Sequence, residues 1–263
     1  MSIPDPLAVI APHYDAMMEH VCYTRWTKTV RELAVLIPRP FVHLDVGCGT
    51  GVLMEMLDGA GWPIVGVDLS PAMLREGRAA RGPFPLAVAD MRRLPFHGSV
   101  GMITCLFDSL NFLLAPEDVR AALASFTAAL RPGGMVYFDV VTEFMMTEYY
   151  AGKTWTDDAD GLGVTWENDY DPATRMCTTR ICFGDGRDGQ ITQERAYPLD
   201  WLAKEVEAAG LTPLGVFDAH GWGKPNGQTE RADFLAVKGV PDAAAGRMDS
   251  VLERVRSAAK RSD

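Results

Sequence analysis

The sequence lacks the features of a disulfide-bonded, zinc-binding or membrane-spanning protein. Its five cysteines are an odd number and include no CxxC pair, so neither a disulfide framework nor a zinc site is expected, and no other metal is predicted. No apolar run approaches the roughly 20 residues of a membrane helix. The N-terminus lacks the basic segment and long apolar core of a signal peptide. We therefore expect a cytoplasmic protein without a membrane partner.

A surplus of positive charge is also missing. The 263 residues carry a formal net charge of -10, whereas a surface that coats nucleic acid needs a basic face. Nucleic acid is therefore not expected as a partner. The length suffices for one large α/β domain with a small inserted or appended piece. Both a monomer and a homodimer remain open.

Strand-like and helix-like segments alternate through the first half of the chain. Apolar runs typical of buried strands occupy residues 41–46, 64–67, 86–89, 100–107 and 135–141, and helical patterns occupy residues 52–60, 71–80 and 116–130. Ser70 and Pro71 are typical of a helix start. A helix at 199–209 and strands at 211–217 and 231–238 follow later. This alternation predicts an α/β fold with a doubly wound, seven-stranded sheet.

The alternation is interrupted between residues 142 and 198. Three β segments, at 161–170, 175–183 and 190–197, predict an inserted antiparallel β-meander. The predicted parts are a helical N-terminal cap over 1–40, helical from 8 to 38, a core over 41–141 and 199–239, the insertion over 142–198 and a C-terminal helix or tail over 240–263. We expect that last part to be a solvated tail, with a dimer contact or a docking surface as alternatives.

A glycine-rich loop, Asp45-Val-Gly-Cys-Gly-Thr-Gly51, follows the first strand. Its glycines allow a sharp turn and the close approach of a ligand. Dinucleotide oxidoreductases place a pyrophosphate at a GxGxxG loop, but here the third glycine of that pattern is replaced by Val52. The loop therefore favours a ligand with a carboxylate and a ribose but no phosphate. Glycines at such a turn could also be purely structural.

Acidic residues end the next three strands. Asp68 could accept both hydroxyls of a ribose, Asp90 with the backbone of Met91 could reach an adenine edge, and Asp108 lies near the switch point of the sheet. Any one of them could simply be a helix N-cap or a solvated carboxylate. Together with the glycine loop, the three favour a nucleoside site.

Five blocks in this order resemble the class I S-adenosylmethionine-dependent methyltransferase domain: HLDVGCGTGVL, VGVDLSPAML, AVADMRRLPF, ITCLFDSLNFL and LRPGGMVYFDV. The segments YDAMM, YTRW, WENDYD and QERAYPL look like a bacterial subgroup with a β-sheet lid after strand five, similar to sugar N,N-dimethyltransferases and glycine N-methyltransferase. The resemblance covers about residues 8–239. It implies a Rossmann-like sheet, S-adenosylmethionine as the cofactor, and methyl transfer to an amine or hydroxyl of a small-molecule substrate.

The resemblance also implies cofactor contacts at the ends of the first four strands and in the N-terminal helices. The contacts to the methionine part are Asp45, Gly47 and Gly49, and the contact to the ribose is Asp68. Those to the adenine are Leu69, Met73, Asp90 and Met91. The backbone at Leu106 and Phe107 would lie near the sulfonium, and Tyr14 and Trp26 would close over the cofactor. Trp26 could equally be a core residue of an amphipathic helix.

The acceptor side is less defined. A general base is needed only if the acceptor must lose a proton; the candidates are Asp108, Tyr14, His13, His220 and Tyr197, and none is distinguished. The residues expected near the acceptor are Asn111, Trp166, Arg195, Tyr197 and Arg231. Trp166 and Tyr197 could instead form a small core of the meander, and Arg195 could pair with an acid of the insertion.

Two other functions remain open. An NAD(P)-dependent oxidoreductase on a related fold would also have a glycine loop, although the missing third glycine and the Asp90-Met91 block argue against it. A non-catalytic module that binds the cofactor would keep the same loop. The insertion and the Asp-Ser-Leu-Asn segment that begins at Asp108 favour catalysis.

Overall fold

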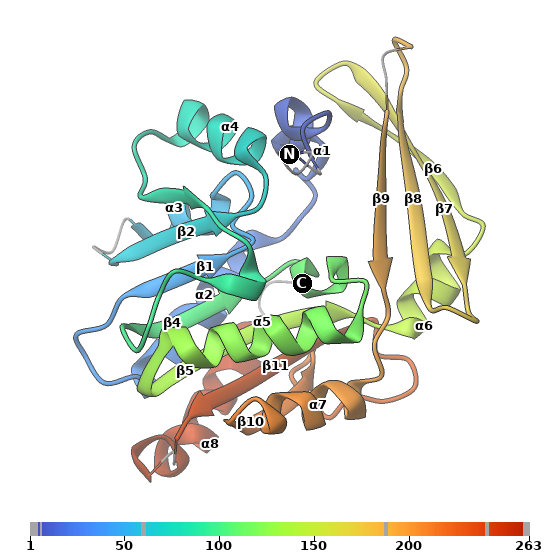
Figure 1. Ribbon diagram of the computed structural model, residues 1–263. Coiled ribbons are helices and arrows are strands. Elements are labelled where there is room, and N and C mark those ends of the chain that lie inside the picture. The colour runs from blue at the N-terminus through green and yellow to red at the C-terminus, as the bar shows by residue number, and fades with distance from the viewer. Residues whose placement is uncertain (1–4, 6, 59–61, 187–188, 240–241, 260–263) are drawn as a thin grey trace.

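The core of the molecule is a seven-stranded sheet. A computed structural model describes residues 5, 7–58, 62–186, 189–239 and 242–259 (Figure 1). The strand order is β10-β11-β5-β4-β1-β2-β3. The strands are β1 (His43–Val46), β2 (Ile64–Asp68), β3 (Leu86–Val88), β4 (Val100–Cys105), β5 (Leu130–Val141), β10 (Leu211–Asp218) and β11 (Arg231–Lys238). The predicted doubly wound sheet is confirmed.

The first five strands pair in parallel, and β11 lies antiparallel between β5 and β10. The chain runs outward from β1 through β2 to β3 and then returns to place β4 on the other side of β1. The strand order therefore reverses between β1 and β4. Ligands of open α/β sheets bind at such a point, beyond the carboxyl ends of the strands.

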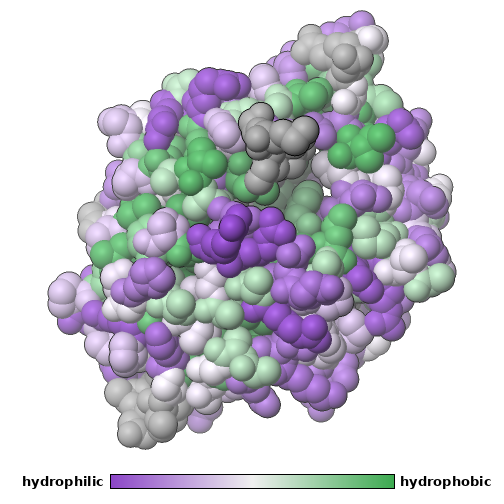
Figure 2. Space-filling model, in the orientation of Figure 1, coloured by the Kyte–Doolittle hydropathy of each residue, from purple (hydrophilic) through white to green (hydrophobic). Residues whose placement is uncertain are grey.

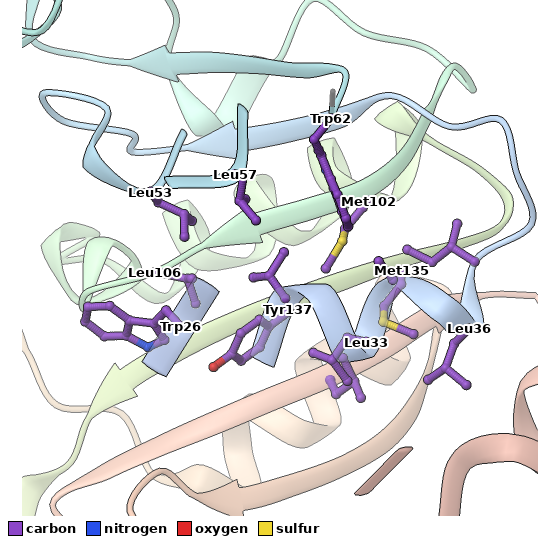
Figure 3. Close-up of a cluster of buried hydrophobic side chains, with 14 of the residues drawn as sticks. Trp26, Leu33, Leu36, Leu53, Leu57, Trp62, Met102, Leu106, Met135 and Tyr137 are labelled. Atoms are coloured by element: carbon purple, nitrogen blue, oxygen red, sulfur yellow. The ribbon is translucent and has the colours of Figure 1, made fainter. Parts of the chain in front are cut away.

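Helices cover both faces of this sheet. One hydrophobic cluster joins α2 (Tyr23–Leu33), α3 (Val52–Asp58), α4 (Pro71–Arg81) and α8 (Asp242–Ala259) to the first face, and a second joins α5 (Pro116–Ala129) and α7 (Leu199–Ala208) to the other. Neighbouring residues of β5 alternate between them, since Tyr137 belongs to the first and Phe138 to the second. Figure 3 shows the first cluster, in which Tyr137 lies between Trp26 and Leu33 in this view.

The ends of α4, α5 and α7 lie within one residue of those predicted from the sequence. Ser70 caps α4, because its Oγ accepts a hydrogen bond of 3.1 Å from the backbone N–H of Met73. Residues 59 and 60, which were predicted to continue the helix from residue 52, lie outside the described residues. Among the described residues, every helix is too short or too polar to cross a membrane.

The C-terminal helix α8 is packed, not solvated, so the predicted tail is wrong. Val251 and Val255 are fully buried in the first hydrophobic cluster. Arg254 forms an ion pair of 2.6 Å with Glu32 on α2, and Arg256 donates a hydrogen bond to the Trp222 carbonyl. Burial of the apolar stripe outweighs the solvation that the arginines of the helix suggested.

The N-terminal region is broken where the sequence predicts continuous helix. A short 3-10 turn, η1 (Ala11–His13), leads into α1 (Tyr14–Met17); the chain then turns before α2, and η2 (Ala34–Leu36) follows α2. The physical reason is that the segment before α2 and α2 itself pack against different sheets. Met17 packs with the inserted sheet, whereas α2 packs on the core sheet.

The insertion forms a four-stranded antiparallel sheet of β6 (Thr154–Ala159), β7 (Leu162–Asp171), β8 (Met176–Phe183) and β9 (Gln190–Arg195), called the inserted sheet below. It stands beside the core on the right of Figure 1. A short helix, α6 (Glu143–Met145), and a π-helical turn, η5 (Met146–Tyr150), lead into it from β5. The predicted meander is confirmed, with one strand more than expected. Residues 187 and 188, within a predicted turn, lie outside the described residues.

Candidate active site

A large cavity opens at the carboxyl ends of β1 and β4, between the core and the inserted sheet. Its volume is about 1070 Å³, at the upper end of the roughly 300–1,000 Å³ of typical small-ligand sites. It can therefore hold a cofactor and an acceptor together. Figure 2 shows apolar surface on both sides of the hollow between the two parts. Every residue that the resemblance assigns to the cofactor lines this cavity.

The glycine loop forms one wall of the cavity. Gly47 and Gly49 have left-handed backbone angles, with φ of +70° and +55°, which residues with a Cβ rarely adopt. A Cβ on Gly47 would lie 2.5 Å from the Oγ of Ser109, in the turn after β4. A Cβ on Gly49 would lie 3.7 Å from the Met73 side chain and 4.0 Å from Tyr14. At these two glycines bare backbone therefore faces the cavity, and Gly47 leaves no room for a side chain.

Asp68 is held at the end of β2 by two backbone groups. Its Oδ2 accepts a hydrogen bond of 2.8 Å from the N–H of Gly49, and its Oδ1 accepts one of 2.8 Å from the N–H of Ser70. Burial raises the pKa of this carboxyl, and the two N–H donors act in the opposite direction. Each carboxylate oxygen has two lone pairs, so both can still accept a bond from a hydroxyl in the cavity.

A buried chain of hydrogen bonds holds Asp45 beneath the glycine loop. Trp62 Nε1 donates to His43 Nδ1 over 3.1 Å, and His43 Nε2 lies 2.8 Å from Thr104 Oγ1, which donates to Asp45 Oδ1 over 2.5 Å. Since an indole can only donate, the proton of His43 is on Nε2. Burial lowers the pKa of His43 to about 3 and raises that of Asp45 to about 7.

The carboxylate of Asp90 forms an ion pair with a neighbouring side chain. Its carboxylate caps the short turn η3 (Met91–Arg93) and pairs with the Arg92 guanidinium, at 2.6 Å from Nη2 to Oδ2. Arg92 also pairs with Asp118 at 2.9 Å. The hydrogen bonds from Arg92 lower the pKa of Asp90. Asp90 lines the cavity, with its charge already neutralised.

Two aromatic side chains come from the N-terminal helices. Tyr14 on α1 lies beside the glycine loop and is partly buried, and its removal from water raises the pKa of its hydroxyl. Trp26 on α2 lies edge-on to Phe107, with 5.6 Å between the ring centroids. Trp26 belongs to the first hydrophobic cluster and also lines the cavity. The two alternatives for this residue, core packing and a cavity wall, therefore hold together.

The segment after β4 is strained. Phe107 and Asp108, neither of them glycine, both have left-handed φ angles, of +58° and +54°. Such strain is concentrated at functional sites. Arg231 on β11 lies over the Phe107 ring, at 5.5 Å from its centroid, and forms a close ion pair with Asp139. Its Nη1 is also 3.5 Å from Asp108 Oδ1. A fixed guanidinium thus lies among the acids at this end of the cavity.

The inserted sheet supplies the facing wall. The register places Trp155, Trp166 and Ile181 side by side across β6, β7 and β8. The rings of Trp155 and Trp166 are stacked, with centroids 6.4 Å apart. Glu194 on β9 also lines the cavity. Glu194 lies in the QERAYPL segment, but only the alternation of side chains along β9 distinguishes it from Arg195 as the residue that faces the cavity.

Three residues predicted to meet the acceptor do not line the cavity. Asn111 is fully buried, and its amide exchanges hydrogen bonds with the backbone of Val141 and donates one to the carbonyl of Arg195. Arg195 and Tyr197 donate to the carbonyls of Leu114 and Leu113. Their polar atoms join the inserted sheet to the core instead. Trp166 and Arg231 do line the cavity.

Three of the five candidates for a general base line the cavity. Asp108 and Tyr14 line the cavity, and so does His220, whose exposed ring lies 3.1 Å from Glu230. His13 lies against the Phe183 ring and does not line the cavity. The hydroxyl of Tyr197 donates a hydrogen bond to the carbonyl of Leu113.

Known proteins share these features. A methyltransferase-domain family matches residues 44–134. The chain is 32% identical over 219 residues to dTDP-3-amino-3,6-dideoxy-alpha-D-glucopyranose N,N-dimethyltransferase of Streptomyces fradiae, covering 80% of this chain and 83% of that protein. A solved S-adenosylmethionine-dependent methyltransferase of Clostridium acetobutylicum aligns with a TM-score of 0.75 at 27% identity, covering 86% and 96% of the two chains.

A second solved relative is an amino pentose methyltransferase of Micromonospora echinaspora with S-adenosylmethionine bound. It aligns with a TM-score of 0.68 at 25% identity, covering 86% of this chain and 96% of that one. These likenesses favour an enzyme over a non-catalytic module and a methyltransferase over an oxidoreductase. The chain belongs to the class I S-adenosylmethionine-dependent methyltransferases, and S-adenosylmethionine is its cofactor.

Proposed function

We propose that this enzyme transfers the methyl group of S-adenosylmethionine to an amine or hydroxyl of a small molecule, by in-line displacement, and that the inserted sheet closes over the reactants. One observation carries the proposal: a single cavity has the glycine loop and Asp68 at one end and Asp108, Arg231 and the inserted sheet at the other. A methyl donor and an acceptor can therefore meet within it.

The proposed cofactor contacts follow the geometry. Asp68 would accept the ribose hydroxyls with the lone pairs that Gly49 and Ser70 leave free. Asp45 and the backbone of Gly47 would lie beneath the methionine part. Leu69, Met73, Asp90 and Met91 would surround the adenine, with the Asp90 charge balanced by Arg92. Leu106 and Phe107 would lie near the sulfonium, with Tyr14 and Trp26 closing the site.

Methyl transfer depends chiefly on the alignment of the acceptor with the methyl group of the donor. S-adenosylmethionine supplies a methyl group on a sulfonium, whose leaving group is neutral. Catalysis can then come mainly from holding the acceptor in line and excluding water. Aromatic side chains on both sides of the cavity serve both purposes, Trp155 and Trp166 on the inserted sheet and Phe107 on the core side.

An amine is the acceptor that we favour over a hydroxyl. The relatives reported above are named for an N,N-dimethyltransfer to an amino sugar and for an amino pentose, and the acceptor end of the cavity is rich in carboxylates. We propose a small-molecule acceptor rather than a nucleic acid, and a monomer or homodimer. The five free cysteines suit a reducing cytoplasm.

The test is turnover of labelled S-adenosylmethionine with matched amine and hydroxyl acceptors, beginning with amino sugars and their hydroxyl analogues. S-adenosylhomocysteine and methylated product should form together, faster with amines. Asp68→Ala should remove measurable cofactor binding in calorimetry, while Asp200→Ala, an exposed change on α7, should leave it intact. Tight binding of S-adenosylhomocysteine without turnover of any acceptor would contradict the proposal.

A further inference from the structure

Glu194 carries a carboxyl group whose hydrogen bonds are unaccounted for. Its Oε2 is inaccessible to solvent and has no hydrogen-bond partner among the described residues. The residue lies on β9 opposite Cys177 of β8 and lines the cavity. A buried carboxyl oxygen without a hydrogen-bond partner is costly. Such a group in the wall of a ligand cavity suggests that its partner is on the ligand.

The surroundings of Glu194 come from four different elements. It interacts electrostatically with Asp108 after β4 and with Arg231 on β11. It also acts on the hydroxyl of Tyr150 in η5 and the thiol of Cys177 on β8, because it raises the pKa of both. Asp108, Arg231 and Tyr150 line the same cavity as Glu194, and Cys177 packs beside it on the neighbouring strand.

Carboxyl groups outnumber the guanidinium that acts on Glu194. That guanidinium belongs to Arg231, which is engaged by Asp139 and lies 3.5 Å from Asp108. The Glu194 carboxyl adds a third acid and receives no hydrogen bond from Arg231 among those of the described residues. A ligand that brings N–H donors and a positive charge would satisfy the site, whereas an anionic ligand would be repelled.

We propose that Glu194 binds the nitrogen of an amine acceptor and takes the proton that the nitrogen must lose before it is methylated. The inference rests on the proposed methyl transfer and identifies its acceptor group and base. An ammonium has no lone pair, so one proton moves from nitrogen to a Glu194 oxygen. The freed lone pair then forms the N–C bond as the C–S bond breaks, and the pair of that bond stays on sulfur.

The environment suits this proton transfer. Burial and the charge of Asp108 raise the pKa of Glu194 well above its usual range, and Arg231 acts in the opposite direction. A raised pKa favours the state in which the carboxyl holds the proton and the nitrogen keeps its lone pair. After transfer the product is an ammonium, and the proton on Glu194 is returned to solvent when the product leaves.

The facing wall indicates the body of the acceptor. Trp155 and Trp166 present a stacked aromatic surface next to Ile181 on the face of the inserted sheet that also carries Glu194. A compact apolar ring can pack against this surface while its amine reaches the carboxyl. The acceptor class is therefore a primary or secondary amine on a compact ring.

The first test measures binding and does not depend on turnover. Cyclohexylamine and the uncharged cyclohexanol are titrated into the complex with S-adenosylhomocysteine in a calorimeter. The amine should bind the wild type at least tenfold more tightly than the alcohol, and Glu194→Gln should remove this preference while S-adenosylhomocysteine binds as before. Equal binding of both probes by the wild type, or an unchanged preference in the variant, would overturn the inference.

The second test follows the rate with the best amine acceptor across pH. Glu194→Gln should lower kcat/KM by about 100-fold or more near neutral pH, and the deficit should shrink at higher pH as free amine becomes abundant. Glu167→Gln, an exposed residue on β7, is the matched control and should behave as the wild type. A Glu194→Gln enzyme with the wild-type rate and pH profile would refute the base. A wild type that binds the amine without turnover would instead refute the proposed transfer.

Discussion

At the scale of single residues, the glycine loop owes its shape to contacts as much as to backbone angles. Gly47 and Gly133 both have left-handed angles, with φ of +70° and +75°, but a Cβ on Gly47 meets Ser109 while one on Gly133 meets open space. The two glycines therefore separate the cost of the angle from the cost of the contact.

We expect Gly47→Ala to lower the melting temperature more than Gly133→Ala and to weaken S-adenosylhomocysteine binding at least tenfold. Gly133→Ala should cost only the free energy of holding a left-handed backbone angle, about 1–2 kcal/mol, and should leave cofactor binding unchanged. Thermal denaturation and calorimetry measure the two effects. Equal losses in both variants would show that the contact with Ser109 is unimportant.

The buried pair Asp45 and His43 makes stability depend on pH in opposite ways. Asp45, with a pKa raised to about 7, contributes stability at low pH that is lost as pH rises from about 4 to 7. His43, with a pKa lowered to about 3, contributes stability that is lost as pH falls from about 6.5 to 3. Between about pH 4 and 6.5 the two slopes cancel.

Asp45→Asn should remove the opposing contribution of Asp45, so that the pH dependence due to His43 becomes measurable. The free energy of unfolding should then rise with pH between about 4 and 6.5, relative to the wild type, by at most about 1.4 kcal/mol per pH unit. Urea denaturation at a series of pH values measures this difference. Parallel curves for the two proteins would mean that Asp45 does not hold a proton in the folded state.

At the scale of elements, the register of a strand decided which predictions held. The residues proposed to bind the cofactor could be placed around one cavity from the sequence, because the glycine loop and the acids after β2 and β3 are close to strand ends. On β9 neighbouring side chains point to opposite faces, so Arg195 was expected in the cavity where Glu194 lies instead. Strand β6 was missed because five of its six residues are exposed, which hides the usual alternation.

The short helix α1 is tied to the glycine loop by one carboxylate. Asp15 accepts a hydrogen bond of 2.5 Å from Thr50 Oγ1 and pairs with Arg81 at 2.7 Å. Asp15→Ala should therefore loosen α1 and weaken S-adenosylhomocysteine binding about tenfold, equivalent to about 1.4 kcal/mol. Calorimetry measures the change, with the exposed Glu19→Ala as control. Identical affinities in the two variants would show that α1 is held by packing alone.

At the scale of the whole molecule, the alternating core was predictable and the docking of the inserted sheet was not. Alternation of apolar runs is local, so the doubly wound sheet could be derived from it. The inserted sheet is held by Ile10 and Met17, which pack against Val164 and Ile181 from far along the chain. No local pattern predicts which distant surfaces will meet, and the acceptor end depends on that meeting.

Because these contacts join α1 to the inserted sheet, cofactor binding should reduce the backbone motions of both. We expect S-adenosylhomocysteine to slow hydrogen exchange in residues 7–17 and in parts of 154–195, as well as in the glycine loop. Tyr14 lies beside the loop and packs with the same cluster, which provides the connection. Exchange measured by mass spectrometry tests this. Protection confined to the glycine loop and α4 would argue against closure.

The inserted sheet is one unbroken stretch of chain, entered after β5 through α6 and left from β9 into α7. The glycine loop proposed to bind the donor and the inserted wall proposed to face the acceptor are therefore encoded in separate blocks of the gene. Substitutions at cavity-facing positions of the inserted sheet that spare its packing against Ile10 and Met17 should change the choice of acceptor more than the affinity for the donor. Under the proposed function, enzymes with this architecture can differ in their products and share one methyl donor.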